Sequence, residues 1–285
     1  MIPNKNNPSP TLESYVLDIL SDRPRLTVKE TYELFLQKSP RSISIQAFYA
    51  LIHKMIKQRI LVKENQTLVI DASWIDALLQ FSQKIKTSYL ENNASMTNII
   101  LHPGEMKEFT FENVMAMDNF WMHALIIMSY YYRKNPHPND QGVYVYNYHS
   151  WFEIVKSGQE QSLAESYEQG GMSYYLLSGS HLYLDKVVKD TIDINNFYYK
   201  TIDPVRDLGK NYYITVIGDI IFETQLPKYI NEIIEDIYLK VKNISEFDRQ
   251  EIINAILLPA KTVLKISHNK IRAKQLREEI KGCFN

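Results

Sequence analysis

The feature that most constrains the fold is a change of period within residues 42–71, SISIQAFYALIHKMIKQRILVKENQTLVID. In its first half, apolar residues recur at helical spacing: Phe48, Leu51, Ile52, Met55 and Ile56. Its second half holds two short β-rich runs, 60–63 and 67–70, on either side of three polar residues. The first pattern predicts a helix with one buried face, and the second predicts a β-hairpin.

Two further helical patterns precede this segment. Thr11 is placed to cap a helix that buries one apolar face, formed by Leu12, Tyr15, Val16, Ile19 and Leu20. Thr27 and Glu30 have the spacing of a capping box, so a second short helix is expected to begin there and to end before Pro40. Residues 11–70 are therefore predicted to form three helices and then a hairpin.

This order of elements resembles the winged helix-turn-helix family of DNA-binding domains. The resemblance implies that the third helix is the recognition helix, which offers its polar face to the major groove. Glutamine can bond adenine edges, serine and tyrosine can bond phosphates or base edges, and lysine neutralises phosphates. The residues predicted to bind DNA are Arg41, Ser42, Ser44, Gln46, Tyr49, His53, Lys54, Lys57 and Lys63.

The distribution of charge agrees with a polyanion-binding N-terminal region. The net charge is only -1, yet residues 41–63 contain five Lys or Arg and no acid. Residues 1–90 carry 12 basic and 8 acidic side chains, 91–260 carry 13 and 23, and 261–285 carry 7 and 2. Such asymmetry is typical of a chain with a nucleic-acid-binding end, although a solvated helix face on a protein-interaction module would have the same pattern.

The whole chain is expected to have a mixed α+β or α/β fold, with a winged helix followed by a larger mixed α/β domain. The predicted divisions are a flexible tail at 1–10, the winged helix at 11–70, a connecting helix and linker at 71–95, and the larger domain at 96–285. This arrangement is loosely like that of TrmB-type transcriptional regulators. The larger domain is expected to dimerise, sense an effector or bind a partner.

Several elements of the larger domain can be predicted from their patterns. Helices are expected at 113–132, 158–169 and 268–281 and after Pro227, and strands at 143–148 and 262–266. Two stretches that each begin with paired tyrosines, 174–185 and 212–223, are predicted to be hairpins with turns at Ser178-Gly179 and Gly218-Asp219.

Tyrosines are concentrated in the middle of the chain. Because tyrosine combines a ring with a polar tip, it is favoured in ligand pockets and interfaces, although packing within a sheet would explain the same enrichment. The predicted ligand pocket or partner surface consists of Tyr146, Tyr148, His149 and Trp151.

No motif predicts catalysis. The sequence has no Walker loop, no GxGxxG after a strand, and no CxxC or HExxH. His268-Asn269-Lys270 and Gly179-Ser180 resemble elements of the phospholipase D superfamily, but their order is reversed and Gln275 stands where an aspartate is expected. Asp219 and Glu223 are placed like the paired carboxylates of metal-dependent nucleases. The lysine that follows in a nuclease ExK motif is absent, because position 225 is glutamine. We therefore expect no catalytic residues, no metal, no cofactor and no enzymatic activity.

The single cysteine, Cys283, is typical of a reducing compartment, and neither a signal peptide nor a membrane span is evident. The expected protein is a cytoplasmic, homodimeric transcriptional regulator that binds double-stranded DNA and responds to a small-molecule or protein effector. The alternatives are a winged-helix protein-interaction module and a nucleic-acid-processing enzyme.

Overall fold

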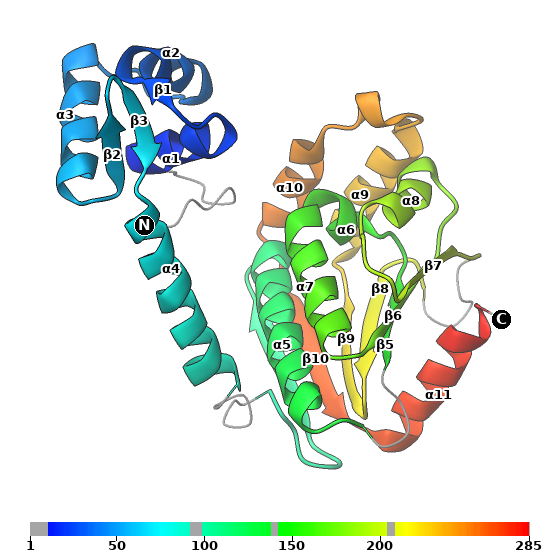
Figure 1. Ribbon diagram of the computed structural model, residues 1–285. Coiled ribbons are helices and arrows are strands. Elements are labelled where there is room, and N and C mark those ends of the chain that lie inside the picture. The colour runs from blue at the N-terminus through cyan, green and yellow to red at the C-terminus, as the bar shows by residue number, and fades with distance from the viewer. Residues whose placement is uncertain (1–10, 92–98, 138–141, 204–208, 285) are drawn as a thin grey trace. The chain divides into compact units, whose positions relative to one another are not determined.

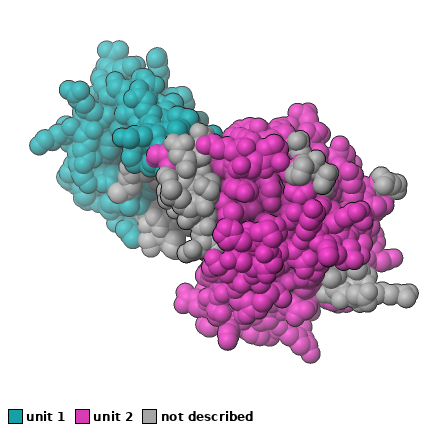
Figure 2. All heavy atoms as spheres, turned by 90° about the horizontal axis from the view of Figure 1, so that it is seen from below, with its two compact units in different colours: residues 1–87 teal, residues 88–285 magenta. Residues whose placement is uncertain are grey.

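The chain forms two compact units, residues 1–87 and 88–285, which are drawn in different colours in Figure 2. The structure, a computed structural model, describes residues 11–91, 99–137, 142–203 and 209–284. The predicted tail at 1–10 and most of the predicted linker lie outside these residues. Each unit is described separately below.

Unit 1 consists of helices around a small antiparallel sheet (Figure 1). Its helices are α1 Leu12–Asp22, α2 Val28–Lys38, α3 Ile45–Lys57 and α4 Ala72–Ile85, the last continued by a π-helical turn over Lys86–Glu91. Its strands are β1 Leu26–Thr27, β2 Leu61–Glu64 and β3 Thr67–Ile70, in the order β1-β3-β2. The prediction of three helices followed by a hairpin is confirmed, whereas the two-residue strand β1 was not predicted.

Local signals place the helices of unit 1. The Thr11 side chain accepts from Ser14 N at the start of α1, and Thr27 and Glu30 form a complete capping box at the start of α2. These helices bury their apolar faces in one core, in which Phe35 packs against Phe48 with ring centroids 5.2 Å apart. The core thus uses one side of α3 and leaves the other side free.

A left-handed residue ends α3. Arg59 has φ +56°, its N–H donates to Ile56 O, and Ile60 N–H donates to Met55 O. This pair of bonds is a Schellman motif, which directs the chain from the helix into β2. Glycine usually takes this position because a Cβ is strained there.

Unit 2 contains a seven-stranded mixed sheet. Its strands are β4 Met106–Phe111, β5 Gly142–Asn147, β6 Ser173–Ser178, β7 Phe197–Thr201, β8 Tyr212–Ile217, β9 Ile220–Gln225 and β10 Thr262–His268. Their order is β4-β10-β9-β8-β5-β6-β7. Strands β5, β6 and β7 run parallel to one another, and the remaining neighbours pair antiparallel.

Helices lie on both faces of this sheet (Figure 1). They are α5 Val114–Lys134, α6 Trp151–Val155, α7 Ser157–Gln169, α8 Tyr183–Val187, α9 Lys228–Lys240, α10 Arg249–Leu257 and α11 Lys270–Gly282, with 3-10 turns at Val188–Asp190 and Ile244–Glu246.

Two apolar cores follow from this layering, because alternate residues of a strand face opposite sides. On β5, Val143 and Val145 belong to the core shared with α5, whereas Tyr144 and Tyr146 belong to the core shared with α11. The expected mixed α+β fold is confirmed: an N-terminal group of helices with a hairpin precedes a larger mixed domain with a seven-stranded sheet.

One of the two predicted hairpins is wrong. Residues 212–217 and 220–225 form a hairpin that turns at Gly218 and Asp219, as predicted. Residues 174–185 do not, because β6 lies between two parallel neighbours and the chain leaves the sheet to form α8. Parallel strands need such crossovers.

Strands β4 and β7 were not predicted. They are the two edge strands of the sheet, and their residues alternate between half-buried and exposed. Without a buried apolar run, an edge strand has a weak sequence signal. Within the described part of the chain, no helix is long and apolar enough to cross a bilayer.

Candidate functional sites

The polar face of α3 is exposed and continuous. Gln46, Tyr49, His53 and Lys57 follow one another at spacings of three, four and four residues, so they form a stripe along one side of the helix. Phe48, Leu51, Ile52 and Met55 are buried on the other side. We call these four exposed residues the α3 stripe.

The other residues predicted to bind DNA are also exposed, but two of them already have structural partners. Ser44 caps α3, since its side chain accepts from Ala47 N. Lys54 donates to Glu13 of α1 at 2.7 Å, and this contact holds the pKa of Glu13 below its usual value. Both residues therefore contribute to the fold, and their availability to a ligand is reduced.

The remaining basic residues around α3 are more available. Arg41 precedes the helix and Lys63 lies on β2, and both are exposed. Among the described residues, neither they nor Lys57 forms an ion pair. Helix α3 itself contains no acidic residue. The stripe and its neighbours thus present positive charge and hydrogen-bonding groups to solvent.

The residues of the predicted pocket or partner surface are all buried: Tyr146, Tyr148, His149 and Trp151. They do not share one environment. Tyr146 faces the core next to α11, whereas Trp151 donates to Tyr213 Oη at 3.2 Å in the opposite core. None of the four lies on an open surface.

His149 is nevertheless the centre of an ionic chain. Its Nδ1 lies 3.0 Å from Asp185 Oδ2, and its Nε2 lies 2.8 Å from Glu235 Oε2. Burial lowers the pKa of His149, but the hydrogen bonds to these two carboxylates outweigh burial and raise it overall. Because both ring nitrogens face carboxylates, the arrangement favours the protonated imidazole, in which both nitrogens donate.

Asp185 is the buried end of this chain and Glu235 its outer end. Asp185 also accepts from Ser150 N at 3.0 Å and Ser178 Oγ at 2.9 Å, so its charge is well stabilised. Glu235 is partly exposed and lies 3.5 Å from Lys210. Because every charge in this chain has a partner, it is best explained as a structural clamp between β5, α8 and α9.

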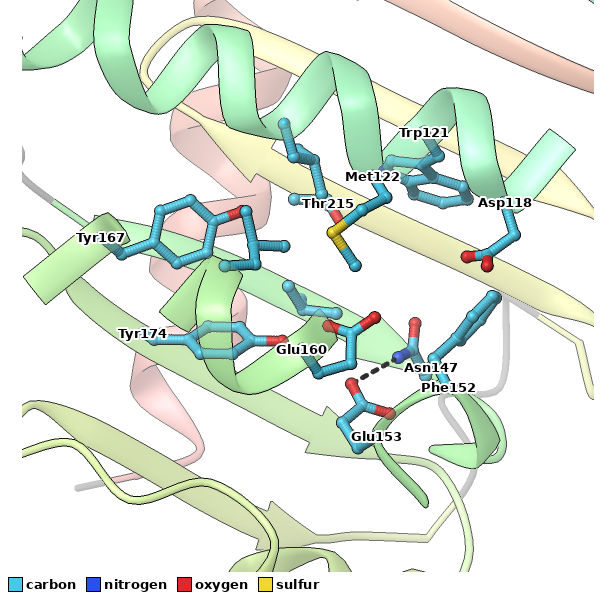
Figure 3. Close-up of a pocket in the computed structure, with 13 residues that line it drawn as sticks. Asp118, Trp121, Met122, Asn147, Phe152, Glu153, Glu160, Tyr167, Tyr174 and Thr215 are labelled. Carbon is cyan, nitrogen blue, oxygen red and sulfur yellow. Dashed lines mark hydrogen bonds between the residues drawn. The ribbon is translucent and has the colours of Figure 1, made fainter. Parts of the chain in front are cut away.

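A second group of buried charges lies at a pocket between α5, α6, α7 and the sheet, whose lining includes Asp118, Glu153 and Glu160 (Figure 3). Lys156 forms an ion pair with Asp118 and also donates to Asn119 at 2.9 Å. Glu153 and Glu160 lie beside this pair, and both are buried. We call Asp118, Glu153, Lys156 and Glu160 the acidic cluster.

Burial raises the pKa of both glutamates of the cluster. Burial raises the pKa of Glu153 to about 8, and the nearby Asp118 adds to this rise. Burial also raises the pKa of Glu160 well above its usual value, and the charge on Glu153 adds to that effect. Burial raises the pKa of Asp118 as well, although the paired Lys156 opposes this rise, so the whole cluster favours protonated acids.

Sequence reasoning missed the acidic cluster, although a signal for it exists. Residues 153, 156 and 160 have the i, i+3, i+7 spacing of one helix face, and Asp118 is the sole acid in the apolar stretch 114–128. This signal is weak, because charged residues at such spacing more often form a solvated face and periodicity cannot tell which side of a helix is inside.

The elements that resemble hydrolase motifs do not form one site. His268 ends β10 opposite Ile220, whereas Gly179 follows β6 and donates to Asn147 O at the other end of the sheet. Glu223 is bound by Arg272 at 2.6 Å, and Asp219 lies in the turn near Arg277. Among the described residues, no group of three or more His, Cys, Asp or Glu is placed to hold a metal ion.

Comparison with known proteins gives little further information. No protein-family model matches the chain, and no curated protein matches its sequence. One solved structure that aligns with it is TrmBL2, described as an archaeal chromatin protein with a novel mode of DNA binding. The alignment covers 98% of this chain and 93% of that chain, with 8% identity and a TM-score of 0.32. A likeness this weak carries no argument about function.

Proposed function

We propose that unit 1 binds double-stranded DNA and that the protein is a transcriptional regulator, with unit 2 as its effector or oligomerisation domain. The observation that carries the proposal is the α3 stripe, an exposed row of Gln46, Tyr49, His53 and Lys57 on a helix without acids. Three helices and a hairpin are the order of elements in a winged helix, whose third helix enters the major groove.

The side chains on and around the α3 stripe have distinct roles in this proposal. Lys57, Arg41 and Lys63 contact phosphates, while Gln46 and Tyr49 reach base edges from the first half of α3. Lys54 contributes less, because releasing it from Glu13 offsets part of what a phosphate contact gains.

The test is an electrophoretic mobility shift with duplexes selected from a random-sequence pool. Lys57→Ala is expected to weaken binding to all sequences and to reduce the slope of log K against log salt by about 0.9. Gln46→Ala is expected to weaken the selected sequence by about 1–3 kcal/mol and other sequences much less. Lys84→Ala, an exposed lysine on α4, is the matched control. Equal binding by wild type, Lys57→Ala and Gln46→Ala would exclude this interface.

The proposal includes a homodimer. Helix α4 buries none of its residues, and its exposed apolar side chains are Ile75, Leu79, Phe81 and Ile85. A dimer would cover such a face and would bring two copies of α3 to two half-sites of an operator. Sedimentation of the DNA complex measures this directly: two chains per duplex are expected, and one chain per duplex would contradict the dimer.

A further inference from the structure

We propose that the acidic cluster is a binding site for the primary ammonium group of a small amine. This inference deepens the effector role proposed for unit 2, but it does not depend on DNA binding. Two carboxyl groups, Glu153 and Glu160, point into the pocket from adjacent helices, and aromatic side chains surround them (Figure 3). Those aromatic residues are Trp121, Phe152, Tyr167 and Tyr174.

Several polar atoms of the pocket lining lack a hydrogen-bond partner. Among the described residues, Trp121 Nε1, Glu153 Oε2 and Tyr167 Oη are buried without a hydrogen-bond partner. The other oxygen of Glu153 accepts from Asn147 Nδ2 at 3.5 Å, and the Tyr174 hydroxyl lies close enough to the carboxyl group to lower its pKa slightly. Because buried polar groups are almost always paired, these three atoms require water or a ligand.

The size of the pocket favours a small group. The centre of a water molecule can move through about 40 Å³ of this pocket. A cavity that holds a single water needs about 10–15 Å³ of such space. The space accepts an ammonium group and a few neighbouring atoms, but not a sugar ring. Met122, the half-buried residue of the lining, is the side chain that can move as a ligand enters.

The chemistry of the lining favours a cation over a neutral or anionic group. A cation between Glu153 and Glu160 favours the ionisation of one of them, which turns a buried acid into a compensated ion pair. The faces of the surrounding rings attract the same charge. An anion would meet Asp118 and two further acids, and the one buried lysine, Lys156, is already paired.

Ionisation of the glutamates gives the site a characteristic pH dependence. The groups that face them are Asp118 on α5, Lys156 between α6 and α7, Tyr167 on α7 and Tyr174 on β6, with Asp185 of α8 nearby. Burial raises the pKa of Glu153 to about 8, so a cation that binds beside this acid displaces its proton within this range of pH. Binding of an ammonium group therefore releases protons, and its affinity rises with pH over this range, by up to about tenfold per unit for each proton released.

The experiment is titration calorimetry of the full-length protein, without DNA, at pH 6, 7 and 8. The probes are ethylamine, ethanolamine and putrescine, and glycerol and acetate serve as neutral and anionic controls. We expect at least one amine to bind, its affinity to rise with pH, and protons to be released when buffers of different ionisation enthalpy are compared. Ethanolamine should bind more tightly than ethylamine if its hydroxyl accepts from Trp121 Nε1.

Two substitutions locate the site. Glu153→Gln and Glu160→Gln keep the shape of the side chain and a neutral group, so both variants should fold, and each should weaken amine binding about tenfold to a hundredfold. Glu165→Gln, an exposed glutamate on the same helix α7, is the matched control and should leave the affinity unchanged.

The proposal is overturned if no amine binds at any of the three pH values, which would mean that the pocket holds only water. It is also overturned if glycerol or acetate binds as well as the amines. Equal amine binding by wild type and both glutamine variants would also overturn it. None of these outcomes bears on the mobility shift with unit 1, so the two proposals fail separately.

Discussion

Units 1 and 2 place their charges in opposite ways. Among the described residues of unit 1, no charged side chain is buried, and its core is apolar apart from Thr31 and Ser39. Unit 2 buries an ionic clamp around His149 and Asp185 as well as the acidic cluster. Charge on a surface is available to an external polyanion at little cost, whereas charge in a core costs stability unless it is paired, protonated or bound to a ligand.

This difference leads to different expectations for function. In unit 1 the residues expected to be important for function are those without a structural role, such as Lys57. In unit 2 they are residues on which the fold itself depends, such as Lys156 and Glu153. The following predictions test the comparison, beginning with the largest expected effect.

The sharpest contrast is between a buried and an exposed ion pair. Lys156→Met leaves the carboxylate of Asp118 buried without its partner and is expected to lower the free energy of unfolding of unit 2 by about 3–5 kcal/mol. Lys54→Ala removes the exposed pair with Glu13 and should cost less than about 1 kcal/mol in unit 1.

Hydrogen exchange resolves the two units separately and is the appropriate measurement. The double variant Asp118→Asn with Lys156→Met should recover much of the lost stability, because it removes the stranded charge. If the two single lysine variants were equally stable, the two units would not differ in the way described here.

A smaller effect concerns pH. The folded protein holds the proton of Glu153 up to about pH 8, whereas the unfolded chain releases it near the ordinary value of 4.5. Between these values the folded state binds more protons, so the stability of unit 2 falls as pH rises, by at most about 1.4 kcal/mol per pH unit from this group. The raised pKa of His149 acts in the same direction above its ordinary value of 6.5.

Glu153→Gln is expected to flatten this slope and to make unit 2 more stable than the wild type at pH 8. Hydrogen exchange or thermal unfolding at pH 5, 6, 7 and 8 measures the slope, with Glu165→Gln as the control that retains it. Parallel curves for Glu153→Gln and the wild type would mean that Glu153 is ionised inside the folded protein.

The smallest effect belongs to unit 1. Arg59 occupies the left-handed position at the end of α3, where glycine carries no Cβ strain. Arg59→Gly is therefore expected to stabilise unit 1 by about 1 kcal/mol, although it also removes a positive charge near the α3 stripe. Thermal unfolding measures the gain, and a loss of stability would show that the Arg59 side chain has a structural role.

Most of unit 1 was predictable from local sequence. The capping residues Thr11, Thr27 and Ser44, the apolar spacing within α3 and the turn after Glu64 each act within a few residues, and they agree with one another. The two-residue strand β1 was missed because its pairing with β3 joins segments about 40 residues apart.

In unit 2, most helices and strands could be predicted from the sequence, but the order of the strands in the sheet could not. The longer helices and most central strands follow from period and composition, whereas the short helices α6 and α8 and the edge strands β4 and β7 were not predicted. The position of β6 between two parallel neighbours is a tertiary property, and it excluded the hairpin expected at 174–185.

By itself, the sequence determined the order of helices and strands, the apolar face of each, and the positive charge on and around α3, because these depend on neighbours along the chain. Only the tertiary structure decided which charged residues are inside. Glu153, Lys156 and Glu160 have the same spacing that an exposed polar face would have. They became a buried cluster because α5, α7 and the sheet close over them, and the energy of a charge depends on the surroundings that packing creates.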